Sequence, residues 1–216
     1  MPTLESMKPA RHALILTAAA ALALLWLGRA NQDSDLWEQA PAEVQAVLWP
    51  VPRPVAGFNL VDQHGQSFAA EDLRGHWSLM YFGYLQCPDV CPTTLQALRG
   101  VQRLQATQPD ARVTRHVFVS VDPANDSPER IAAYLGYFGD AFTGLAGNPA
   151  ELQKLTDSLG VIHAEHVDQA GVRSIDHTTA IIVVDPEVRG VGALSAPHDP
   201  ASMLQRLRAL QEYLSR

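Results

Sequence analysis

Short apolar runs alternate with amphipathic stretches along most of this 216-residue sequence, and this alternation constrains the fold more than any other feature. Ser78–Tyr84 and Val113–Val121 are apolar runs of strand length. The stretch between them carries apolar residues at helical spacing, namely Leu95, Leu98, Val101 and Leu104. A strand, helix, strand unit of this kind predicts two parallel strands with a helix packed on one face of their sheet.

The remaining apolar patterns predict the other elements. A hairpin is expected over Phe58–Phe68, and a helix is capped by Ser127 with Pro128 at its first position. The next helix covers Pro149–Leu159, with Asn148 and Glu151 as a capping box and Gly160 at its end. Two strands, Thr179–Val184 and Val188–Leu194, follow about a turn at Asp185-Pro186, and the last helix covers Met203–Leu214. The order ββαβα(α)ββα predicts an α/β protein with a thioredoxin-like fold, in which helices flank a central mixed sheet.

An uncharged apolar run over residues 13–28 precedes these elements, with Lys8 and Arg11 before it and Arg29 directly after it. Its length lies between that of a secretory signal core and that of a spanning helix, so a signal cleaved after Ala30 and a retained anchor both stay open, and we favour the anchor. The basic residues before the run predict a single-pass protein of the inner (cytoplasmic) membrane with its C-terminal domain on the periplasmic side.

The sequence therefore divides into three expected parts. Residues 1–30 are a cytoplasmic stub and membrane anchor, residues 31–56 are a proline-rich tether, and residues 57–216 are the folded domain, which begins at Gly57. Beyond residue 30 the chain has 13 basic and 22 acidic residues, a net charge of −9. Such an acidic domain is not expected to bind nucleic acid.

The two cysteines of the sequence, Cys87 and Cys91, lie between the first core strand and the long helix, where ligands bind in open α/β sheets. A bridge across so short a loop would stabilise the fold little, so a functional role is favoured over a structural disulfide. Three residues separate the two cysteines, a spacing that is wide enough for both sulfurs to bind one soft metal ion. With the helix expected to begin at Pro92, the Cys91 thiol is expected to be more acidic than usual.

His177 precedes the buried Thr179–Val184 strand, where a residue facing the cysteine loop belongs if the fold is thioredoxin-like. Two thiolates and one imidazole suit Cu(I), whereas zinc would want a fourth ligand. A histidine that is merely hydrogen-bonded in the core stays open as the alternative.

Three blocks of sequence carry a resemblance to a known family: Tyr81–Leu95 (YFGYLQCPDVCPTTL), Ser120–Pro128 (SVDPANDSP) and Asp176–Thr178. In order and separation they resemble the signature blocks of the Sco/SenC copper chaperones. The resemblance implies that Cys87, Cys91 and His177 bind copper. The bound ion is expected to be Cu(I), and binding of Cu(II) is left open.

The resemblance also implies a membrane anchor, an upstream copper donor, and delivery of copper to the dinuclear site of cytochrome c oxidase subunit II. The family often has Thr where Leu85 stands and Arg where Asn125 stands. Neither position is a metal ligand. Asp122 and Asp126 match acidic positions of the family and are left outside the ligand set.

Two enzymatic alternatives differ in what they require of these residues. A thiol-disulfide reductase that keeps the acceptor's cysteines reduced would use Cys87 and Cys91 as its redox pair and would tolerate the loss of His177. A peroxidase is disfavoured, because the sequence lacks a Thr-x-x-Cys arrangement with a nearby arginine.

The other histidines are not expected to bind metal. His163 and His166 would point to opposite faces of a strand. Four others, namely His64, His76, His116 and His198, are expected at the surface.

Overall fold

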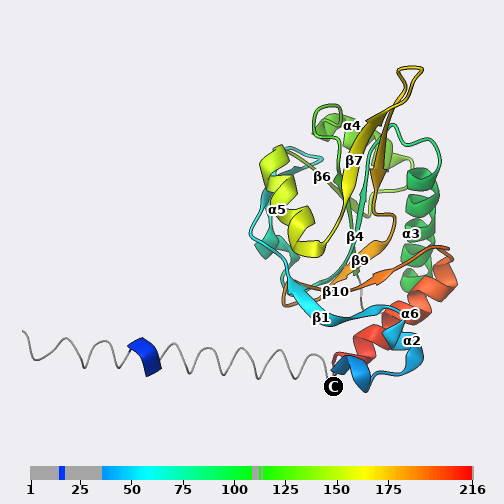
Figure 1. Ribbon diagram of the computed structural model, residues 1–216. Helices are drawn as coiled ribbons and strands as arrows, with labels where there is room; N and C mark the ends of the chain where they lie inside the picture. Colours follow the sequence, from blue (N-terminus) through cyan, green and yellow to red (C-terminus); the bar gives the residue numbers. More distant parts are fainter. Residues whose placement is uncertain (1–14, 18–35, 109–111, 113, 216) are drawn as a thin grey trace, which may run out of the picture.

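The computed structural model describes residues 15–17, 36–108, 112 and 114–215, and its centre is an eight-stranded mixed sheet (Figure 1). The strands follow the order β1-β10-β9-β4-β5-β6-β2-β3. Their bounds are β1 Leu48–Pro54, β2 Asn59–Asp62, β3 Ser67–Ala69, β4 Trp77–Gly83, β5 Thr114–Ser120, β6 Phe142–Ala146, β9 Ile181–Val184 and β10 Arg189–Leu194. Strands β4, β5 and β6 are parallel and the other pairs are antiparallel, as the predicted mixed sheet requires.

Strand β4 is buried along its whole length, and its side chains alternate between two hydrophobic clusters. Leu79 and Tyr81 lie on the face that packs against α2 (Ala42–Gln45), α3 (Val90–Ala106), α4 (Pro128–Gly136) and α6 (Pro200–Tyr213). Met80 and Phe82 lie on the opposite face, which α5 (Pro149–Leu159) covers. This layering confirms the thioredoxin-like α/β arrangement, and it directs the carboxyl end of β4 into the loop that carries the cysteines (Figure 1).

The predicted caps of α4 and α5 are confirmed, with one difference. Ser127 caps α4 and Asn148 caps α5, while Gly160 ends α5 in the left-handed conformation with φ of 68°. Glu151, however, does not complete a capping box. Its carboxylate accepts instead from the backbone amide of Asn59 at 2.9 Å, and so links α5 to the start of β2.

The start of the folded domain at Gly57 is corrected by the structure. Within the predicted tether of residues 31–56, α2 and β1 are folded parts of the domain, and β1 forms the edge of the sheet beside β10. Val44, Val47 and Leu48 are buried in the core formed with α6. The prolines of β1 misled the prediction, because an edge strand tolerates residues that cannot donate a ladder hydrogen bond.

The structure adds strands β6 and β8 (Arg173–His177) to the predicted elements, and it confirms a strand at His163 and His166. Strand β6 completes the parallel part of the sheet after α4. A separate two-stranded hairpin of β7 (His163–Val167) and β8 extends from the body of the molecule (Figure 1). The hairpin is mostly exposed, so β8 lacks the apolar alternation that would reveal this strand in the sequence.

Most of the predicted membrane segment, residues 13–28, lies outside the described residues, which include only a short helical turn at 15–17. Within the part of the chain that the structure describes, none of the helices has the length and apolar character needed to cross a membrane.

Candidate metal centre

The two cysteines lie at the junction of β4 and α3. The helix begins at Val90, two residues earlier than expected, so Cys91 belongs to its first turn. Cys91 is fully buried and Cys87 is partly exposed, and both are free thiols. The backbone amide of Cys91 donates to the Cys87 sulfur at 3.4 Å. This amide at the start of the helix therefore forms its hydrogen bond with the Cys87 sulfur and not with the Cys91 sulfur.

His177 is the last residue of β8, and its ring is directed at the cysteines. Its Nε2 lies 3.5 Å from the Cys91 sulfur, and its Nδ1 lies 3.1 Å from the carbonyl oxygen of Thr178. Because a carbonyl only accepts, Nδ1 carries the proton and donates, which leaves the Nε2 lone pair facing the sulfur. Burial lowers the pKa of His177. The ring is thus held neutral, in the form in which an imidazole can bind a metal.

The three predicted ligands come together, as the sequence prediction of the site requires. The Cys87 and Cys91 sulfurs and a ring nitrogen of His177 all lie within 4.8 Å of one another, and no other group of three or more His, Cys, Asp or Glu residues does so among the described residues. One metal ion can therefore contact all three atoms after small adjustments. Two thiolates and one imidazole form a soft donor set that suits Cu(I).

Aromatic rings enclose the imidazole. Tyr81 and Tyr84 each meet the His177 ring edge-on, with ring centroids 6.0 Å away. On the sulfur side, Gly83 leaves room for Cys91, because a Cβ atom at Gly83 would lie 2.8 Å from that sulfur. The glycine therefore has a packing role beside the metal centre that sequence analysis missed.

The expected acidity of the Cys91 thiol is wrong. Burial raises its pKa to about 12, although the Tyr81 hydroxyl and the Tyr84 backbone act in the opposite direction. Desolvation outweighs the helix terminus here because the sulfur is fully covered. A metal that binds Cys91 must consequently displace a proton.

Asp126 holds the loop that leads to the cysteines. Its buried carboxylate accepts from the Ser120 hydroxyl at 2.7 Å and from the Leu85 amide at 3.1 Å. Burial raises the pKa of Asp126. The helix cap is supplied by Ser127 instead, so Asp126 orders the loop and is not a ligand.

The four histidines expected at the surface fall into three environments. His64 and His76 are exposed, as expected. His116, predicted at the surface, is buried in β5, and burial lowers its pKa to about 4. His198, also predicted at the surface, is half-buried, with ring nitrogens 3.4 Å from the Thr94 hydroxyl and 3.2 Å from the Leu194 carbonyl oxygen.

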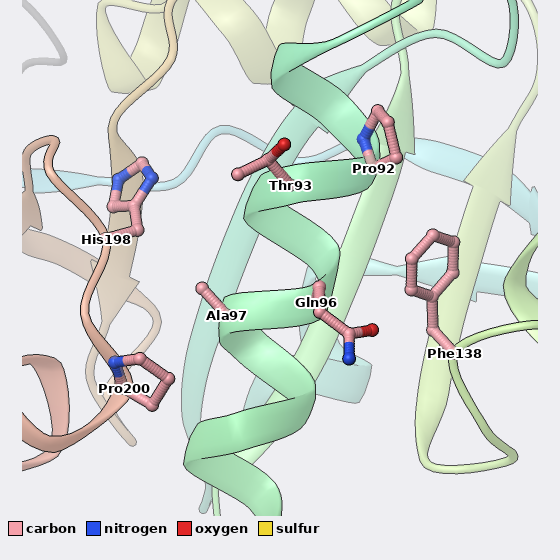
Figure 2. A pocket seen from close by; sticks show the side chains of 7 residues that line it. All are labelled: Pro92, Thr93, Gln96, Ala97, Phe138, His198 and Pro200. Carbon is pink, nitrogen blue, oxygen red and sulfur yellow. The ribbon is translucent and has the colours of Figure 1, made fainter.

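The surface beside the cysteine loop is hollowed along α3. An open groove of about 590 Å³ lies between this helix, Phe138 and the segment of His198 and Pro200. Figure 2 shows the side chains that line it. Its helix wall begins with Pro92, the residue after Cys91. No charged side chain lines the groove among the described residues.

Comparison with known proteins agrees with the geometry. The sequence model of the SCO1/SenC family matches residues 51–212. The mitochondrial SCO2 homolog of Mus musculus is 32% identical over 183 residues, covering 82% of this chain and 69% of the relative.

Two solved structures with copper bound have the same fold. ScoI of Bradyrhizobium japonicum is 33% identical with a TM-score of 0.65, covering 74% of this chain and 99% of that one. Yeast Sco1 is 27% identical with a TM-score of 0.68, covering 74% and 90%. The family match extends over nearly the whole folded domain and includes all three cluster residues, Cys87, Cys91 and His177. This chain therefore belongs to the SCO1/SenC family.

Proposed function

We propose that this chain is a copper chaperone that binds copper through Cys87, Cys91 and His177 and delivers it to the dinuclear copper site of cytochrome c oxidase subunit II. The observation that carries the proposal is the convergence of two sulfurs and one imidazole nitrogen within 4.8 Å. Copper-bound relatives of the same fold support the choice of metal. The acceptor follows from the resemblance of the three motif blocks to copper chaperones of oxidase assembly.

The unequal burial of the ligands suits transfer. Cys91 is fully covered, whereas Cys87 is partly exposed on the loop. An incoming ligand of the acceptor would first replace Cys87, and Cys91 and His177 would release the metal afterwards. With three ligands, Cu(I) is held without a closed coordination shell, so a fourth atom can approach before a bond breaks.

The uncharged run over residues 13–28, with basic residues before it, supports a location for this activity. The run would anchor the chain in the cytoplasmic membrane, with the folded domain on the periplasmic side. An upstream donor would supply copper on that side, and the membrane-bound acceptor would be within reach of the domain.

The metal assignment is tested by anaerobic Cu(I) titration of the reduced full chain in detergent against a competing chelator. One Cu(I) should bind tightly, and Cys87→Ser, Cys91→Ser and His177→Ala should each weaken binding severely. His76→Ala, at an exposed histidine, is the control and should leave binding unchanged. If copper stays with the chelator, the chaperone assignment fails.

The thiol-disulfide reductase remains the second candidate, because the two free sulfurs lie close enough to form a disulfide after a small shift. Delivery is tested by mixing the copper-loaded chain with the copper-free, reduced copper domain of subunit II, in which the dinuclear spectrum should appear. A reductase would instead reduce an oxidised acceptor without copper. That activity should survive His177→Ala, whereas copper delivery should not.

A further inference from the structure

His163 lies directly across the hairpin from the metal ligand His177. Strands β7 and β8 are antiparallel, and their register pairs the two histidines. The flanking pair of Ile162 and Thr178 is hydrogen-bonded, since the Thr178 amide donates to the Ile162 carbonyl at 2.9 Å. Pairs alternate along an antiparallel ladder, so the two histidines form a non-hydrogen-bonded pair, in which side chains lie closest, with Cβ atoms about 5 Å apart.

The hairpin presents both histidines on one face. Side chains opposite each other in a ladder share a face, so His163 lies on the side of the hairpin that carries the buried Ile175 and the ligand His177. His163 is half-buried, and its ring has no hydrogen-bond partner in the described part of the chain that would hold it in place. His166 lies on the other face, where its Nε2 meets Asp176 at 3.0 Å.

From this arrangement we infer that His163 is a fourth ligand, recruited when the site holds Cu(II). The inference rests on the proposed copper site. Cu(I) is satisfied by two thiolates and one imidazole, whereas Cu(II) prefers four ligands with nitrogen among them in a tetragonal arrangement. The His163 ring lies outside the present cluster of three, so it joins by rotation about its side-chain bonds. Because His163 is paired with His177 across the hairpin, its ring has only a short distance to move to the copper.

The consequence is a site whose ligand number follows the oxidation state of its copper. Cu(II) would be held by two sulfurs and two imidazoles, and Cu(I) by two sulfurs and one imidazole. Only the His163 side chain has to move when it binds or leaves the copper. The pairing of β7 with β8 therefore stays intact. The Cu(I) form, with its open side, would remain the form that is transferred.

The number of imidazoles bound to copper tests this inference. One equivalent of Cu(II) is added as the ion to the reduced full chain in detergent, and pulsed electron paramagnetic resonance counts the coordinated imidazoles. We expect two in the wild type and one in His163→Gln. The matched control His166→Gln, three residues away on the opposite face, should keep two. Cu(II) affinity should fall about tenfold or more in His163→Gln, since even an outer-shell partner contributes that much.

Cu(I) affinity separates this inference from the proposed function. His163→Gln should bind Cu(I) as the wild type does, whereas His177→Ala should not. One imidazole in the wild type, or no difference between His163→Gln and His166→Gln, would overturn the role of His163 while leaving the three-ligand site intact. A wild type that binds neither oxidation state would overturn both.

Discussion

Arg173 donates to both carboxylate oxygens of Asp122, at 2.7 and 3.0 Å, and so ties β8 to the loop after β5. Asp122 is buried and also accepts from the Asn125 side chain at 2.9 and 3.1 Å. Although burial acts to raise the pKa of Asp122, the hydrogen bonds from Arg173 and Asn125 outweigh it and lower the pKa. Because β8 ends at His177, this ion pair positions a proposed metal ligand four residues away.

Replacing Arg173 should loosen the hairpin and weaken copper binding. Arg173→Met leaves the buried Asp122 carboxylate without its charged partner, which we expect to lower the free energy of unfolding by about 1–3 kcal/mol. Arg173→Lys keeps the charge but loses the two-pronged geometry and should have an intermediate effect. Chelator competition for Cu(I) and urea unfolding measure the two consequences.

A second substitution shows whether the effect comes from this ion pair. Combined with Asp122→Asn, Arg173→Met should lower stability by less than the sum of the two single changes. Strict additivity, or unchanged copper affinity in Arg173→Met, would show that the pair does not position His177.

Gly83→Ala should disturb the metal centre without touching a ligand. The added Cβ would lie 2.8 Å from the Cys91 sulfur and 3.1 Å from the Phe118 ring, so the sulfur or the ring must move. Overpacking of this kind should lower the free energy of unfolding by about 1–3 kcal/mol. Cu(I) affinity should fall as well. Gly57→Ala is the matched control, because nothing lies within 4 Å of its added Cβ. Equal behaviour of the two variants would contradict the packing role of Gly83.

Truncation tests the corrected domain boundary. A chain that begins at Gly57 loses α2 and β1, and with them the burial of Val44, Val47 and Leu48. Each buried side chain of this kind contributes about 1.5–3 kcal/mol, so the truncated domain should be several kcal/mol less stable than the full chain. Urea unfolding of the two chains provides the comparison. Equal unfolding midpoints would mean that the segment is a tether after all.

The sequence predicted those parts of the fold in which the local sequence pattern favours the same secondary structure as the tertiary packing. The apolar run of β4 and the capping residues Ser127 and Asn148 satisfy local rules and lie where those rules place them. Strand β8 and its pairing with β7 escaped prediction because both strands are mostly exposed and carry polar residues on both faces.

The convergence of the three candidate ligands was predictable for a different reason. Only three residues separate Cys87 from Cys91, and His177 precedes a recognisable buried strand. Their surroundings were not predictable, because the contact of His177 with Cys91 and the contact of Asp122 with Arg173 join segments 51 or more residues apart. No local pattern encodes such contacts.

His116 should make the stability of the metal-free protein depend on pH. The Thr114 hydroxyl donates to Gln105 at 3.0 Å, so the His116 Nε2, 3.1 Å from that hydroxyl, must donate to it. The buried Nδ1 is then unprotonated, without a partner among the described residues. A second proton would be both buried and unpaired, and burial accordingly lowers the pKa to about 4.

The direction of the effect follows from this lowered pKa. In the unfolded chain the histidine takes up a proton below about pH 6.5, whereas the folded chain takes it up only near pH 4. The contribution of His116 is therefore fully present above pH 6.5 and declines towards pH 4, by roughly 3 kcal/mol in all. Urea unfolding from pH 7 to pH 4 should show the decline in the wild type and a shallower one in His116→Gln. Parallel curves for the two proteins would mean that His116 is protonated equally in the folded and unfolded states.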